Sequence, residues 1–122
     1  MEYVITQESD TETVVIETSG MINTKVAEKM VLAAGLELNN TNFQRCFFDL
    51  ANTEVDPNQT MADMFMFIAV FKKTGIKKSV RMAALYATGG AHRLILEKSA
   101  SAEGFNLKHF IDRNAALSWL CQ

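Results

Sequence analysis

Two short runs of the sequence are mostly apolar, at residues 43–50 and 80–87. Strands in the middle of a sheet covered on both faces have this composition, because neither side of the strand meets water. Helical segments are expected after both runs, over residues 57–73 and 91–102. A helix between two strands returns the chain to the same end of the sheet, so the sequence predicts parallel strands covered by helices.

The first third of the chain predicts a hairpin followed by a helix. β-Branched and aromatic residues cluster at 3–7 and 13–19, around a polar turn, which is typical of two antiparallel strands. Gly20 is expected to close the second strand. From residue 23 to residue 38 the apolar residues recur at helical spacing. We therefore expect a helix there, ended by the turn-forming residues 39–42.

The last part of the chain adds a short strand at residues 105–111 and a final helix at 114–121. The predicted order is therefore ββαβαβαβα, an α/β sandwich with a mixed, mainly parallel sheet of about five strands and four helices. The 122 residues are 48% hydrophobic and 21% charged, which fits one folded domain over residues 1–122.

Nothing in the sequence predicts export or membrane insertion. The N-terminal residues 1–4 include no basic residue and lead into no long apolar segment, so we expect no signal peptide. The longest apolar stretch, residues 64–71, has eight residues, whereas a membrane span needs about 20. Cys46 and Cys121 are expected to be free thiols in a cytoplasmic protein.

Three stretches of the sequence share features with a known family. The hairpin ends in Ser19-Gly20, residues 47–50 are followed by Val55-Asp56, and the tail over residues 110–120 ends in Trp119-Leu120. This pattern resembles the SpoIIAA-like family, whose STAS domain is grouped with the SEC14-like fold. The resemblance implies a SpoIIAA-like sandwich and a regulatory, protein-binding role like that of the bacterial anti-sigma factor antagonists.

Members of that family carry a serine or threonine directly after the loop aspartate, and a partner kinase phosphorylates it. Here Asp56 is followed by Pro57, Asn58 and Gln59, and the nearest hydroxyl belongs to Thr60, one turn into the predicted helix. A helix N-terminus favours phosphate, but Thr60 lies deeper than the family motif requires. The chain is therefore expected to lack the phosphoserine motif.

The predicted helix over residues 57–73 has apolar side chains on two faces. One stripe should pack on the sheet, and the second needs cover from the same domain, from a second copy or protein partner, or from a small lipid-like ligand. Methionine and phenylalanine suit an adaptable contact surface. The expected partner or ligand surface comprises Asp56, Asn58, Thr60, Met64, Met66, Phe67 and Val70.

Charge is divided unevenly along the chain. Residues 1–63 carry 11 acidic and 3 basic side chains, a net charge of −8, whereas residues 64–122 carry 3 acidic and 9 basic, a net charge of +6. A basic cluster accounts for much of the second value: Lys72, Lys73, Lys77, Lys78 and Arg81. No recognition helix or interleaved aromatic residues accompany the cluster, so nucleic acid is not expected as a partner. An acidic partner or a second copy fits it better.

A turn at residues 89–93 is a weaker candidate, as an anion site made by Gly89, Gly90, His92 and Arg93. An ordinary strand-to-helix turn explains the same residues, because the spacing of a phosphate-binding loop is missing. Neither His92 nor His109 has a metal-ligand partner at the right spacing, and no nucleophile motif is present. We therefore expect no catalytic residue, metal or cofactor.

These observations predict a non-enzymatic protein-interaction module that acts through a protein partner or as a homodimer. The alternative is a module that binds a small apolar or lipid-like ligand between the helix over residues 57–73 and the sheet.

Overall fold

The computed structural model of the protein describes residues 2–55, 69–87 and 91–122. Within these ranges a five-stranded sheet has the order β1-β2-β3-β4-β5. The first two strands are antiparallel and the other neighbours are parallel, so the sheet is mixed. The strands are β1 (Glu2–Glu8), β2 (Thr13–Ile22), β3 (Arg45–Val55), β4 (Arg81–Tyr86) and β5 (Asn106–Phe110).

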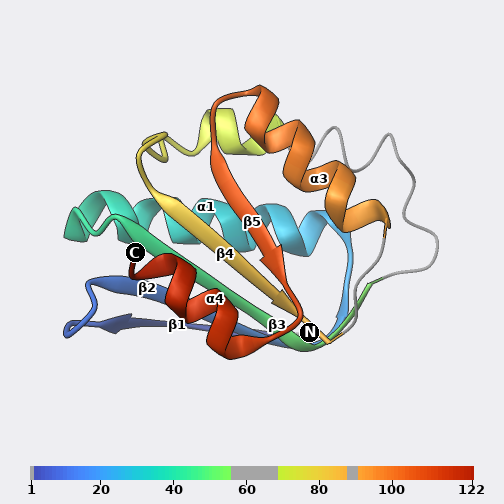
Figure 1. Ribbon diagram of the computed structural model, residues 1–122. Helices are drawn as coiled ribbons and strands as arrows, with labels where there is room; N and C mark the ends of the chain where they lie inside the picture. Colours follow the sequence, from blue (N-terminus) through green and yellow to red (C-terminus); the bar gives the residue numbers. More distant parts are fainter. Residues whose placement is uncertain (1, 56–68, 88–90) are drawn as a thin grey trace.

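Helices lie on both faces of this sheet (Figure 1). The labelled helices are α1 (Thr24–Thr41), α3 (Ala91–Ala102) and α4 (Arg113–Leu120), and residues 69–73 are also helical. Helices α1 and α3 and the segment 69–73 pack on one face, and α4 packs on the other. The predicted order ββαβαβαβα and the α/β sandwich are confirmed.

Strand β3 shows why the central apolar runs are continuous. Cys46, Phe48 and Leu50 belong to the large core cluster under α1 and α3, whereas Phe47 belongs to the smaller cluster under α4. Successive side chains of a strand point to opposite faces, and here both faces are covered. Burial of each large apolar side chain contributes roughly 1.5–3 kcal/mol, so these runs hold both helix layers on the sheet.

The structure corrects the expected ends of two strands. Strand β2 does not end at Gly20, which lies inside the strand with φ 88°, but continues to Ile22. Strand β3 continues through residues 51–55, where a loop was expected. The two extensions pair with each other, with Ile22 opposite Val55. Backbone hydrogen bonds between the strands therefore outweigh the weak strand propensity of both segments.

Helix α1 begins after the Asn23 cap, whose side chain accepts a hydrogen bond from the Val26 N–H. It runs to Thr41, three residues past the expected end, and then stops at Asn42, which has the left-handed conformation with φ 60°. Asparagine tolerates this conformation better than most residues do. The longer helix spans the sheet and forms one wall of the site described next.

Candidate functional site

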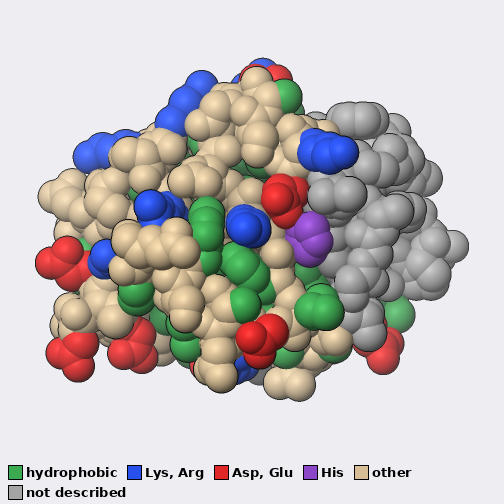
Figure 2. All heavy atoms as spheres, viewed as in Figure 1, with side chains coloured by type: hydrophobic (Ala, Val, Ile, Leu, Met, Phe, Trp, Pro, Cys, Tyr) green, Lys and Arg blue, Asp and Glu red, His purple; other side chains and the backbone are tan. Residues whose placement is uncertain are grey.

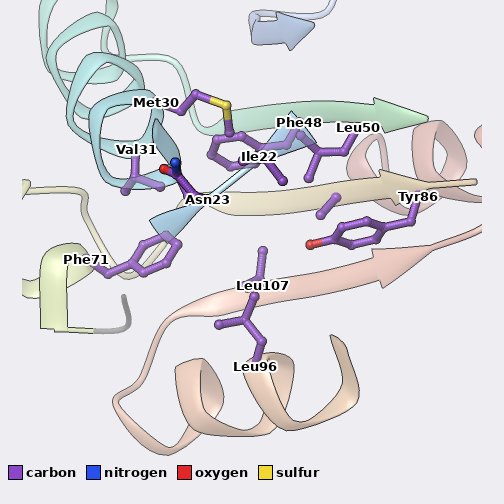
Figure 3. A pocket seen from close by; sticks show the side chains of 12 residues that line it. Ile22, Asn23, Met30, Val31, Phe48, Leu50, Phe71, Tyr86, Leu96 and Leu107 are labelled. Atoms are coloured by element: carbon purple, nitrogen blue, oxygen red, sulfur yellow. The ribbon is translucent and has the colours of Figure 1, made fainter. Parts of the chain in front are cut away.

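An apolar pocket of about 100 Å³ lies between the sheet, α1 and α3 (Figure 3). Its floor is formed by side chains from four strands: Ile22, Phe48, Leu50, Ala84, Tyr86 and Leu107. Its walls come from α1 and the residue that caps it, from α3 and from the segment 69–73: Asn23, Ala27, Met30, Val31, Phe71 and Leu96. The pocket is partly open rather than fully enclosed.

Small side chains beside large ones create this space. Phe48 of β3 lies opposite Ala84 of β4 in the parallel register, and both side chains face the pocket. Ala27 on α1 likewise adds only a methyl group to the opposite wall. An alanine in a layer of phenylalanine, leucine and methionine leaves volume that its neighbours do not fill.

Polar groups are sparse among the described residues that line the pocket, where Asn23 and Tyr86 have the only polar side chains. The Asn23 side-chain oxygen accepts the Val26 N–H and caps α1. Figure 3 shows Tyr86 extending from β4 with its hydroxyl directed inward, toward the middle of the lining side chains. None of these described lining residues is charged, so the pocket favours uncharged, mainly apolar molecules.

A titratable pair beside this floor joins β5 to α3. His109 lies opposite Ala84 in the sheet register, and its ring pairs with the Glu97 carboxylate. Glu97 also accepts a hydrogen bond from the His109 backbone N–H at 3.2 Å. The carboxylate is therefore already engaged by His109, and neither residue lines the pocket.

Both cysteines are free, as the sequence predicted, with Cys46 buried and Cys121 exposed. Burial raises the pKa of the Cys46 thiol well above its ordinary value, so this thiol stays protonated and unreactive near neutral pH. Within the described ranges, no group of three His, Cys, Asp or Glu side chains is placed to hold a metal ion. No helix in that part of the chain is long and apolar enough to cross a membrane.

Most residues of the predicted partner surface lie outside the described residues: Asp56, Asn58, Thr60, Met64, Met66 and Phe67. Val70 is described and is 8% exposed, packed in the large core cluster together with Phe71. Val70 therefore packs in the core and is not part of an exposed partner surface. Val70 and Phe71 are adjacent in the sequence, and both reach the core. The segment 69–73 lies between α1 and the loop that carries Phe105, and the ring centres of Phe71 and Phe105 are 5.6 Å apart.

The predicted anion turn is also largely outside the described residues. Gly89 and Gly90 lie there. His92 and Arg93 belong to the first turns of α3, but their side chains fall outside the described part. The anion site stays a prediction.

The basic cluster is partly engaged within the chain itself. Lys72 Nζ lies 2.9 Å from a Glu103 carboxylate oxygen, and Lys78 Nζ lies over the Phe105 ring. Figure 2, seen from the side of α4, shows lysines and arginines at the upper left, where residues 72–78 lie, and carboxylates at the lower left, at the turn between β1 and β2. On this face the basic side chains of residues 72–78 and the carboxylates of the β1–β2 turn therefore lie apart from each other.

Sequence reasoning placed a ligand between the helix over residues 57–73 and the sheet, and it missed most of the pocket. Phe71 is the only member of that helix among the described lining residues. The lining depends on which residues face each other across β3 and β4, and that register follows from the whole sheet. The two small residues Ala27 and Ala84 were the available signal, but the sequence does not show that they share a cavity.

Comparison with known proteins identifies the fold. No family model matches the chain, and no curated protein matches it. An uncharacterised protein of the DUF3478 family with a SpoIIAA-like fold, from Shewanella loihica PV-4, aligns with a TM-score of 0.57 at 16% identity, over 98% of this chain and 93% of that one. The unphosphorylated anti-sigma factor antagonist SpoIIAA aligns with a TM-score of 0.50 at 10% identity, over 98% and 97% of the two chains. The protein therefore has the SpoIIAA-like fold.

Proposed function

We propose that the protein is a non-enzymatic interaction module that binds a protein partner. The SpoIIAA-like fold supports this proposal, because one structure with that fold is an anti-sigma factor antagonist, a protein that acts on a regulator. Fold likeness alone does not carry a function. The observation that carries the proposal is an exposed apolar surface on one half of the sheet.

This surface lies on β1 and β2, on the face that α4 occupies farther along the sheet. Tyr3 and Ile5 pack against the core under α1, so Val4 between them points to the opposite face. Val4 is 61% exposed and Met21 is 54% exposed. The described contacts of α4 are with β3, β4 and β5, and they leave this half open.

We call the group Val4, Glu17, Ser19 and Met21 the open sheet face. Glu17 lies opposite Val4 in the antiparallel register, and Glu17 and Ser19 are both exposed. Exposed apolar side chains next to charged and polar ones are common in protein contacts, and here Glu17 and Ser19 lie between Val4 and Met21 along the strands. A partner with an apolar patch and a basic rim would fit it.

Binding experiments with surface variants test this function. Val4→Lys places a charge in the open sheet face, and Leu36→Lys is the matched control because Leu36 is 66% exposed on α1. The tagged wild-type protein and the control should retain the same protein from a host lysate, and Val4→Lys should lose it. Equal retention by all three proteins, or no specific retention, would contradict the proposal.

A second copy of the chain is one such partner. Native mass spectrometry at micromolar concentration distinguishes this case, because a homodimer should appear with the wild type and dissociate with Val4→Lys. A strictly monomeric wild type would leave a different protein as the partner.

The apolar pocket supports a second candidate function, the binding of a small apolar ligand. The main support for this function is a partly open cavity of about 100 Å³ whose described lining has no charged residue. Native mass spectrometry of the gently purified protein should detect a bound small molecule, or a titration with apolar probes should raise the melting temperature. A protein that neither carries nor takes up such a molecule would exclude this function.

A further inference from the structure

We propose that the pocket selects uncharged ligands, and that its ligand is one ring or a chain of about six carbons with a single hydroxyl or carbonyl group placed at Tyr86. This inference rests on the second candidate function and names the chemical class that the pocket accepts. It follows from three properties of the pocket, which are its volume, its lack of charged groups and the position of its polar groups.

The volume sets the size of the buried part of the ligand. The pocket measures about 100 Å³, and an apolar cavity of about 150 Å³ in another protein holds benzene. On this scale about four heavy atoms fill the enclosed space, and the rest of a ring or of a six-carbon chain has to extend through the open side. A full-length lipid chain does not fit inside the described walls.

The lining excludes a charged end group. Ile22, Met30, Phe48 and Leu107 surround the cavity with carbon and sulfur atoms, and no described lining residue carries a charge. A carboxylate or an ammonium group buried there would lose its hydration without gaining a counter-ion. Glu97 and His109 lie near the floor, but they are paired with each other and do not line the space.

The polar groups decide where a neutral end group sits. The Asn23 side-chain oxygen is held by the Val26 N–H at 3.0 Å, and it belongs to the cap of α1. Figure 3 shows the Tyr86 hydroxyl directed toward the interior of the pocket. A phenolic hydroxyl can donate one hydrogen bond and accept others, so it can serve a ligand hydroxyl or carbonyl in addition to a protein group.

The selectivity can be measured with four probes of similar size at pH 7: 1-hexanol, benzene, hexanoate and hexylammonium. Binding is followed by shifts of backbone amide signals in two-dimensional NMR. We expect 1-hexanol and benzene to shift the amides of Ala27, Ala84 and Leu107. We expect the two charged probes to bind at least about tenfold more weakly, because of the cost of burying their charge.

Variants of the lining residues show whether the probes bind in this pocket. Ala84→Leu fills the pocket and should abolish binding of 1-hexanol, whereas Ala115→Leu, at an exposed position of α4, should leave it unchanged. Ala27→Leu blocks the opposite wall and replaces Ala84→Leu if that variant does not fold. Tyr86→Phe should weaken 1-hexanol about threefold to tenfold through the lost hydrogen bond and leave benzene unchanged.

The outcomes separate the inference from the function on which it rests. If no probe binds, the pocket is not a ligand site and both fail. If hexanoate binds as tightly as 1-hexanol, the preference for uncharged ligands is wrong while the ligand-binding function stands. If both filling variants fold and still bind 1-hexanol, the site lies elsewhere and the inference is overturned.

Discussion

Arg113 of α4 donates a hydrogen bond to Asp49 of β3, with Nη2 and Oδ2 2.6 Å apart. Asp49 is only 8% exposed, and its other carboxylate oxygen accepts the Ala51 N–H at 3.3 Å. The Arg113 guanidinium also lies over the ring of Phe47. A buried carboxylate needs such partners, so this pair fixes the start of α4 over the middle of the sheet.

Replacement of Arg113 should destabilise the fold. In Arg113→Ala the Asp49 carboxylate keeps its buried position and loses its charged partner, so the free energy of unfolding should fall by about 1–3 kcal/mol. Urea denaturation followed by circular dichroism measures the change. Arg113→Lys, which keeps the positive charge, should lose less. A loss below about 0.5 kcal/mol for Arg113→Ala, which is typical of a neutral surface change, would show that the pair contributes little.

Two arginines hold the other end of α4. Arg81 Nη1 donates to the Trp119 carbonyl oxygen at 2.9 Å, and the Arg45 Nε donates to the Leu120 carbonyl oxygen at 2.7 Å. The Arg81 guanidinium also lies 5.7 Å from the centre of the Trp119 ring. Carbonyl groups in the last turn of a helix have no partner within the helix, and these arginines, which lie opposite each other in β3 and β4, supply it.

Loss of Arg81 should therefore be visible at Trp119, the one tryptophan of the chain. Arg81→Ala should change the tryptophan fluorescence spectrum of the native protein and lower the free energy of unfolding by about 1–3 kcal/mol. Lys77→Ala, at an exposed position of the same basic cluster, is the control and should change neither property. Identical spectra for Arg81→Ala and the wild type would contradict the contact.

The fold could be predicted well because its main signals are local. The apolar run around Phe47 and Phe48 indicated a strand covered on both faces, and helices were found on both sides of it. The helical spacing of Met30, Val31 and Leu38 indicated the face of α1 that is buried in the structure. Each of these patterns depends on residues within a few positions of one another.

The pocket and the strand ends could not be predicted, because they depend on distant residues. Ile22 and Val55 extend their strands only because they pair with each other. Ala84 lines a cavity because the sheet register places it beside Phe48. Ala27 on α1 lines the opposite side of the same cavity. No local pattern in the sequence contains this information.

Helix α1 passes so close to the segment before β4 that a side chain at residue 35 would be crowded against Thr74. A Cβ atom on Gly35 would lie 3.0 Å from the Thr74 Cβ and 3.1 Å from the Thr74 carbonyl oxygen. Alanine is the better helix former by about 1 kcal/mol, yet Gly35→Ala should destabilise by about 1–3 kcal/mol because backbone must move.

Thermal and urea unfolding of Gly35→Ala measures this effect. Ala33→Gly, two residues earlier in the same helix, is the control and should lose about 1 kcal/mol through helix propensity alone. If Gly35→Ala raised the free energy of unfolding, the close approach of α1 to Thr74 would be wrong.

The two cysteines should react at very different rates. Cys121 is exposed and Cys46 is buried, and only an accessible thiolate can attack a disulfide reagent. At pH 8 a disulfide reagent should therefore modify one thiol of the native protein quickly and the second only in denaturant. Cys121→Ser should remove the fast reaction. Two equally fast reactions in the native wild type would contradict the burial of Cys46.

Burial of Cys46 also predicts how stability depends on pH. The pKa of the thiol is raised in the folded state, whereas in the unfolded chain it is about 8.5. Above that pH the unfolded state binds fewer protons than the folded state, so the free energy of unfolding should fall as pH rises, by up to about 1.4 kcal/mol per pH unit. Urea denaturation between about pH 7.5 and 9.5 should show this slope in Cys121→Ser and a smaller slope in Cys46→Ala. Equal slopes in the two variants would show that ionisation of Cys46 is not coupled to unfolding.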